Sequence, residues 1–227
     1  MPDYLDPKLN ILPKAQQEIW SFLSPAPELS FVLYRGTAVA LHLGHRISLD
    51  FDFFRTATLH KSEMQGFFAF MHDARIIQEE RNTLVVIATM PSGPVKLSFF
   101  GGLDIGRIND PLLTKDSTLL VASLDDLLAT KLKAILDRAE AKDYRDISAM
   151  LAAGVSLEKA LGGFGKMYRR DPALALRALG FFRDGDLPTL PEKDQQLLRA
   201  ARDRVREIPD VAVKYGSLAV PLRAGKT

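Results

Sequence analysis

Asp50 and Asp52 lie two residues apart in the run LDFDFF, at positions 49–54. The aromatic content and the brevity of this run predict a β-strand, in which alternate side chains point to the same face. Both carboxylates would then point the same way, and two like charges side by side repel each other. Burying them costs still more free energy unless a cation lies between them. The pair therefore predicts a divalent metal site.

A strand, a tight turn and a helix are predicted directly upstream of this pair. The apolar run FVLY at 31–34 stops at Arg35, Gly36 and Thr37, and the helix-compatible pattern that follows ends at Gly44. Gly36 allows either a positive φ or a close approach to a ligand, and Thr37 is expected to cap the helix. The free amides of a first helical turn bind phosphate oxygens. Since most Gly-Thr turns are only helix caps, the predicted phosphate site depends on the carboxylate pair beside it.

Length and composition limit the class of protein. The chain has 227 residues, of which 47% are hydrophobic and 26% charged, as in a soluble globular protein of one large or two small domains. A net charge of +2 gives no overall field that would attract nucleic acid or an anionic membrane. The sequence contains no cysteine, no membrane-spanning apolar stretch and no signal-peptide pattern. We expect a cytoplasmic protein without a membrane partner.

The remaining patterns of the first half predict further elements of one sheet. An apolar, mixed-periodicity segment at 7–23 predicts a packing helix, and Ser62 is the expected N-cap of another. Residues 101–116 are rich in Gly, Asp and Pro and predict a long loop before a short strand. Three β-like runs predict an antiparallel meander, at residues 74–78, 83–89 and 95–100.

A second informative stretch, residues 123–151, predicts two helices with charged side chains at regular spacing. Lys131 and Arg138 are seven residues apart and so share one side of the first helix. Asp143 and Asp146 are three apart and share one face of the next helix. A solvated helix pair with surface ion pairs has the same pattern, so the spacing alone leaves both interpretations open.

These motifs resemble those of the AbiEii/AbiGii-type nucleotidyltransferases, toxins of type IV toxin–antitoxin and abortive-infection systems in the polymerase-beta-like superfamily. The resemblance implies an α/β (α+β) fold with a mixed nucleotidyltransferase sheet flanked by helices and followed by a C-terminal helical bundle. It implies a sheet domain at 1–122 and a helical domain at 123–227 that completes the active site. The matching residues are Gly36, Thr37, Ala38, Leu41, Gly44, His45, Arg46, Ser48, Asp50–Phe54, Asp126, Lys131, Arg138, Lys142, Asp143 and Asp146.

The resemblance also implies an activity, which is Mg²⁺-dependent transfer of a nucleoside monophosphate from an NTP to an acceptor RNA, such as tRNA, or protein. Lys131 would stabilise the charge that builds on the transferred phosphate, and Asp143 would orient Lys131 or the nucleophile, or act as the base. A DNA-binding antitoxin encoded nearby is the expected partner. The expected ligands are Asp50 and Asp52 for Mg²⁺, and Gly36, Thr37, Arg46 and Ser48 for the nucleotide.

The run VKLSFF at 95–100 departs from the family pattern, because Ser98 stands where many superfamily members have a third carboxylate. Two-metal phosphoryl transfer uses such a carboxylate to hold the second ion or to deprotonate the nucleophile, and serine does neither well. Three alternatives stay open. The site could work with two carboxylates and one principal Mg²⁺, a base could come from elsewhere, or the protein could be a catalytically weak nucleotide-binding module that sequesters a partner.

Overall fold

The computed structural model describes residues 3–221, and contacts between residues divide the chain into two compact units. The first unit runs to Asp104, takes in Asp110–Ala122 and resumes at Tyr215. The second unit comprises Ile105–Asn109 and Ser123–Lys214. Each unit therefore combines segments that are far apart in the sequence.

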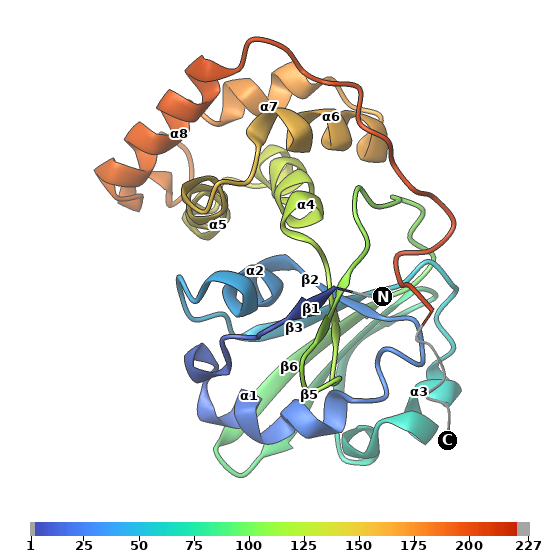
Figure 1. Cartoon of the computed structure of the whole chain (residues 1–227). Helices are drawn as coiled ribbons and strands as arrows, with labels where there is room; N and C mark the ends of the chain where they lie inside the picture. Colours follow the sequence, from blue (N-terminus) through green and yellow to red (C-terminus); the bar gives the residue numbers. More distant parts are fainter. Residues whose placement is uncertain (1–2, 222–227) are drawn as a thin grey trace. The chain divides into compact units, whose positions relative to one another are not determined.

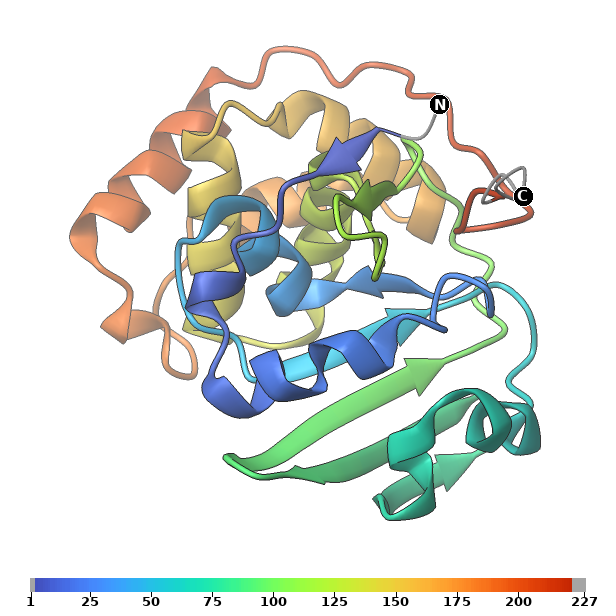
Figure 2. The same ribbon diagram turned by 60° about the horizontal axis from the view of Figure 1, so that its bottom comes forward.

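The first unit is built on a mixed sheet, which has eight strands within residues 3–221 and the order β1-β7-β8-β2-β3-β6-β5-β4. Neighbours β2 and β8, β3 and β6, and β1 and β7 are parallel, whereas the other neighbouring pairs are antiparallel. Figure 2 shows β5 and β6 as a long hairpin beside β3. The strands are Tyr4–Leu5 (β1), Val32–Tyr34 (β2), Asp50–Phe54 (β3), Arg75–Glu80 (β4), Thr83–Met90 (β5), Gly93–Phe100 (β6), Leu112–Thr114 (β7) and Leu120–Val121 (β8).

Helices cover both faces of this sheet, with α1 and α2 on opposite sides (Figure 1). Strand alternation explains the division, because Phe51 and Phe53 of β3 point into the core on one face, where Trp20 packs 6.4 Å from Phe51 between ring centroids. Asp50 and Asp52 consequently point to the other face. The helices of the first unit are Lys14–Ile19 (α1), Arg35–Leu43 (α2) and Lys61–Phe67 (α3), with 3₁₀ turns at Leu9–Ile11, Trp20–Leu23 and Ala69–His72.

The second unit is helical, as the sequence predicted for the C-terminal part. Ser123 caps α4, since its hydroxyl accepts the amide hydrogen of Asp126, and Pro172 stands in the first turn of α7. The helices are Leu124–Asp137 (α4), Ala141–Ala152 (α5), Leu157–Tyr168 (α6), Pro172–Ala178 (α7) and Glu192–Arg204 (α8), with a 3₁₀ turn at Leu187–Thr189. The mixed sheet with its helices and the helical second unit confirm the predicted fold class.

Several predicted boundaries were wrong for identifiable reasons. The helix expected at 7–23 is broken, because Leu12 precedes Pro13 and adopts an extended ψ of 135°, so α1 begins after the proline. Ser62 is not an N-cap, since α3 begins at Lys61. The loop expected at 101–116 contains β7, which pairs with β1 and β8. Strands this short are held by their neighbours and leave little trace in the sequence.

None of the helices within residues 3–221 is both long enough and apolar enough to cross a lipid bilayer.

The aromatic core of the first unit gives a direct test of this packing. Phe99 of β6 is fully buried against Phe31, Phe53 and Phe68, at centroid distances of 5.3, 5.1 and 5.5 Å. Phe99→Ala should lower the free energy of unfolding by about 3–5 kcal/mol, because it leaves a cavity. Phe67→Ala, at a side chain that is 44% exposed, should cost less than about 1 kcal/mol. Urea unfolding followed by the fluorescence of Trp20, the single tryptophan, measures both; equal losses would contradict the assigned core.

Candidate active site

Four polar side chains form what we call the carboxylate face, made of Asp50 and Asp52 of β3 with Lys96 and Ser98 of β6. The two strands are parallel, and their register sets Asp50 beside Lys96 and Asp52 beside Ser98. Side chains in register on neighbouring strands point to the same face, so all four point away from the aromatic core. The predicted common orientation of the two carboxylates is confirmed. Ser98 lies beside Asp52, so the residue at the place where the resemblance implied a third acid is next to the carboxylate pair.

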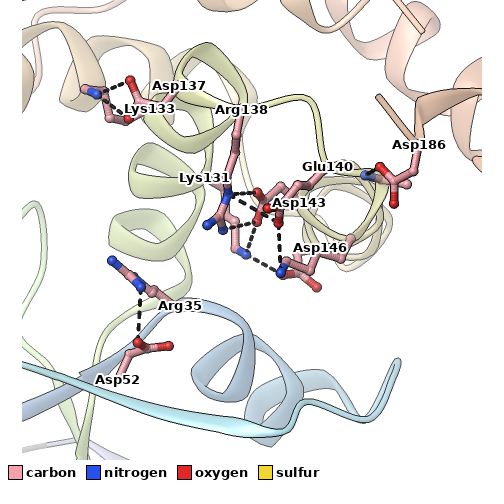
Figure 3. Close-up of polar contacts among 12 residues, drawn as sticks. Arg35, Asp52, Lys131, Lys133, Asp137, Arg138, Glu140, Asp143, Asp146 and Asp186 are labelled. Carbon is pink, nitrogen blue, oxygen red and sulfur yellow. Dashed lines mark hydrogen bonds and ion pairs between the residues drawn. The ribbon is translucent and has the colours of Figure 1, made fainter. Parts of the chain in front are cut away.

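Each aspartate of this face pairs with a half-exposed cation. Arg35 Nη1 donates to Asp52 Oδ1 at 3.1 Å (Figure 3), and Lys96 Nζ lies 3.9 Å from Asp50 Oδ2. Burial raises the pKa of the Asp52 carboxyl; the charge of Arg35 acts against this rise, and the charge of Asp50 adds to it. Because the net shift is upward, Arg35 does not fully offset the cost of ionising Asp52.

The first turn of α2 lies close to the other residues predicted to bind phosphate. A Cβ on Gly36 would come within 2.6 Å of Arg46 Nη2 and 3.0 Å of Ser48 Oγ, so the Arg46 guanidinium packs directly against the backbone of Gly36. Thr37 is buried inside the first helical turn, and its hydroxyl donates to the carbonyl oxygen of Asp50. Gly36, Arg46 and Ser48 therefore lie close together, and Thr37 ties the same helical turn to the backbone of Asp50.

One expectation about the start of α2 was wrong. Thr37 is not the N-cap, because α2 begins directly at Arg35 with Tyr34 in the cap position. Of the two roles left open for Gly36, a positive φ is not the one found, since the left-handed φ here belongs to Arg35, at 61°. By contrast, Gly44 ends α2 in the left-handed conformation, with φ 66°, as predicted.

The donor set of the carboxylate face fits a magnesium ion that brings its own further ligands. Within residues 3–221, no group of three or more His, Cys, Asp or Glu side chains is arranged to hold a metal ion. Mg²⁺, however, commonly binds to proteins through one or two carboxylates and completes its octahedral shell with water and substrate phosphates. Asp50 and Asp52 supply two such carboxylates, and the raised pKa of Asp52 marks a site where added positive charge would be stabilising.

The second unit contains an ionic cluster in which all members but Arg138 are buried, and which we call the Lys131 cluster: Lys131, Arg138, Asp143 and Asp146. Lys131 Nζ on α4 lies 2.6 Å from Asp143 Oδ1 and 2.6 Å from Asp146 Oδ2, both on α5 (Figure 3). Arg138, at the C-cap of α4, donates from Nε to Asp143 Oδ2 at 2.8 Å. The side chains of both aspartates are fully buried, and that of Lys131 is 5% exposed. The predicted common face of Asp143 and Asp146 is confirmed.

The contacts of Asp143 determine how basic it is. Burial alone would raise the pKa of its carboxyl, but the hydrogen bonds and charges of Arg138 and Lys131 outweigh burial and lower the pKa below its ordinary value. A carboxylate with a lowered pKa is a weak proton acceptor. Of the alternative roles considered for Asp143, this geometry favours orienting Lys131.

Asp126 also matches the family motifs, and inside the second unit its carboxylate holds a backbone segment in place. Its carboxylate accepts the amide hydrogens of Ile108 at 2.6 Å and of Asn109 at 3.1 Å. These bonds tie the segment Ile105–Asn109 to the start of α4. Burial raises the pKa of the Asp126 carboxyl, although the hydrogen bond from Ser123 acts in the opposite direction.

The sequence pattern gave no role to Arg35, which proves to contact the carboxylate face. Its guanidinium also lies over the rings of Phe100 and Phe54, at 4.9 and 5.5 Å from the centroids. The only signal in the sequence was a cation at the junction of a strand with a Gly-Thr turn. Such a position does not by itself show where a long side chain points.

Comparisons with known proteins agree with these motifs. A family model described as "Nucleotidyl transferase AbiEii toxin, Type IV TA system" matches residues 22–215, a range that includes the carboxylate face and the Lys131 cluster. A protein of Aquifex aeolicus (strain VF5) that is described as uncharacterized is 27% identical over 161 residues, which are 68% of this chain and 74% of that protein.

The Lys131 cluster predicts a strong dependence of stability on one lysine. Lys131→Met should lower the free energy of unfolding by about 3–5 kcal/mol, because it leaves two buried carboxylates without their shared cation. Lys133→Met is the matched control on the same helix; Lys133 pairs with the exposed Asp137 and should contribute less than about 1 kcal/mol. Urea unfolding followed by helical circular dichroism measures both. Equal losses would show that the buried cluster does not hold α4 and α5 together.

Proposed function

Because the chain belongs to the nucleotidyl transferase AbiEii toxin family of type IV toxin–antitoxin systems, we propose that it transfers a nucleoside monophosphate from an NTP to a tRNA or protein acceptor. The observation that supports this most is the carboxylate pair, Asp50 and Asp52, on one face of β3, close to the start of α2 at Gly36 and Thr37. The family implies an antitoxin partner, which we propose is a DNA-binding protein encoded nearby.

Asp50 and Asp52 are the proposed ligands of Mg²⁺. When bound, this ion would neutralise charge on the phosphates and stabilise the leaving pyrophosphate. The two carboxylates differ in exposure, since the side chain of Asp50 is 45% exposed and that of Asp52 is 10% exposed. Asp52 would therefore anchor the ion at the sheet, and Asp50 would face the side from which solvent and substrate arrive.

Gly36, Thr37, Arg46 and Ser48 are proposed to hold the triphosphate. Gly36 leaves room for the Arg46 guanidinium directly over the turn, and a guanidinium matches phosphate oxygens with paired donors. The Ser48 hydroxyl, at the same turn, offers a further donor. Thr37 uses its hydroxyl on the Asp50 carbonyl, which fixes the first turn of α2 against β3. Its contribution would be to position this turn for the nucleotide.

Lys131 is proposed to stabilise the negative charge that develops on the transferred phosphate. Asp143 and Asp146 fix its Nζ between two carboxylate oxygens, so the charge has one defined position on α4. Arg138 adds a second positive charge beside Asp143 and also lies 3.4 Å from Glu140. Asp143 would act as a positioning residue because its lowered pKa makes it a poor base.

The transfer is tested by incubating the protein and Mg²⁺ with each α-³²P-labelled NTP, total tRNA and cell lysate. The wild type should label an acceptor, and the Asp50→Asn/Asp52→Asn double variant should label about a hundredfold less or worse, because the metal ligands are lost. The matched control is the Asp6→Asn/Asp73→Asn double variant, which has the same change in charge at two exposed positions of the same unit.

Each alternative gives its own result in this assay. Undiminished labelling by the Asp50→Asn/Asp52→Asn variant would contradict the proposed metal site. A wild type that binds Mg·NTP in calorimetry but labels nothing would identify a nucleotide-binding module that acts by sequestration. Hydrolysis of NTP or RNA without incorporation would identify a phosphoesterase.

A further inference from the structure

Arg35 holds an unfavourable backbone conformation at the edge of the candidate site. Its φ of 61° lies in the left-handed region, which side chains with a Cβ rarely adopt. Strained residues of this kind persist where the surrounding structure holds them, and they are common at ligand sites. The conformation directs the residue from the end of β2 toward β3 and β6, where its side chain has three partners.

Those partners are one carboxylate and two aromatic rings. Arg35 Nη1 contacts Asp52 Oδ1 at 3.1 Å, and the guanidinium lies over Phe100 and Phe54. The rings form an apolar base for the planar cation, and 43% of the Arg35 side chain is exposed. Arg35 is thus a cation that rests on rings and is held at one edge by a carboxylate.

The contact with Asp52 conflicts with metal binding at the same carboxylate. The side chain of Asp52 is only 10% exposed, and its Oδ1 is the acceptor of the Arg35 bond. A divalent ion at Asp52 would stand close to the guanidinium, and two cations at one small carboxylate repel each other. An arriving nucleotide brings phosphate oxygens, which a guanidinium binds as well as it binds a carboxylate.

We propose that Arg35 and a divalent cation compete for Asp52, and that a triphosphate relieves the competition by taking over Arg35. This inference rests on the proposed function, since it uses Asp50 and Asp52 as metal ligands. Arg35 is then a nucleotide-binding residue that couples metal binding to triphosphate binding. The metal alone binds weakly because it must displace Arg35, and the metal with the triphosphate binds tightly because the displaced guanidinium has a new partner. Coupling of this kind is reciprocal between the two ligands.

The test measures binding by calorimetry, with Mn²⁺ as the metal and inorganic tripolyphosphate as a probe that requires no knowledge of the preferred base. For the wild type, tripolyphosphate should raise the affinity for Mn²⁺ on the order of tenfold or more. Arg35→Gly should bind Mn²⁺ alone several-fold more tightly and lose most of the enhancement. Glycine adopts this φ without strain, so the variant should fold and show an unchanged or higher Tm.

Lys96→Ala is the matched control for a general loss of positive charge. Lys96 is as exposed as Arg35 and lies beside Asp50 on the same face, at 3.9 Å. Lys96→Ala should raise the affinity for Mn²⁺ slightly, because it removes one nearby positive charge. The increase in Mn²⁺ affinity that tripolyphosphate causes should stay as large as in the wild type. Loss of the enhancement in Lys96→Ala to the same extent as in Arg35→Gly would overturn the specific role of Arg35.

Two results separate the failure of this inference from the failure of the proposed function. If Arg35→Gly keeps both the wild-type affinity for Mn²⁺ and the full enhancement, Arg35 does not compete for Asp52, and the inference is overturned while the metal site stands. If the Asp50→Asn/Asp52→Asn variant binds Mn²⁺ like the wild type, the metal site and the inference are both overturned. The same holds if neither the wild type nor any variant binds Mn²⁺, with or without tripolyphosphate. Binding of Mn²⁺ alone that is detectable only in Arg35→Gly would support the competition.

Discussion

Repulsion between Asp50 and Asp52 is the constraint on which the candidate site depends. Alternation along β3 puts both carboxylates on one face, and the sheet register adds Lys96 and Ser98 beside them. A third acid at position 98 would increase the repulsion, whereas serine leaves only two negative charges to offset. Arg35 and Lys96 offset them from half-exposed positions, where side chains can still move. This arrangement underlies the proposal that a divalent cation replaces these weaker partners.

The second unit also holds two neighbouring carboxylates, but here a buried lysine lies between them. Lys131 lies between Asp143 and Asp146, both fully buried, and Arg138 pairs with Asp143 from a partly exposed position. Buried charges are tolerated when each has a partner at hydrogen-bond distance, and removal of one is then costly. Such a cluster fixes one lysine rigidly but leaves its carboxylates with little basicity. The protein therefore combines half-exposed cations on the sheet with a buried lysine on the helices.

Much of this arrangement could be predicted from short-range patterns. The period of a strand predicted the common face of Asp50 and Asp52, and the period of a helix predicted that of Asp143 and Asp146. The features that the sequence did not predict depend on contacts between residues far apart in the chain. The positive φ lies at Arg35, whose side chain contacts β3 and β6, and nothing in the local sequence predicted it. Thr37 is not the cap, and its hydroxyl donates to the carbonyl oxygen of Asp50. Likewise, β7 exists because β1 and β8 supply its hydrogen bonds.

The proposed metal site is tested most directly by anomalous diffraction from crystals grown with Mn²⁺ and a non-hydrolysable NTP analogue. The predicted result is an anomalous peak about 2.0–2.3 Å from carboxylate oxygens of both Asp50 and Asp52, with phosphate oxygens in the same coordination shell. A bound nucleotide whose Mn²⁺ lies away from both aspartates would contradict the proposed site.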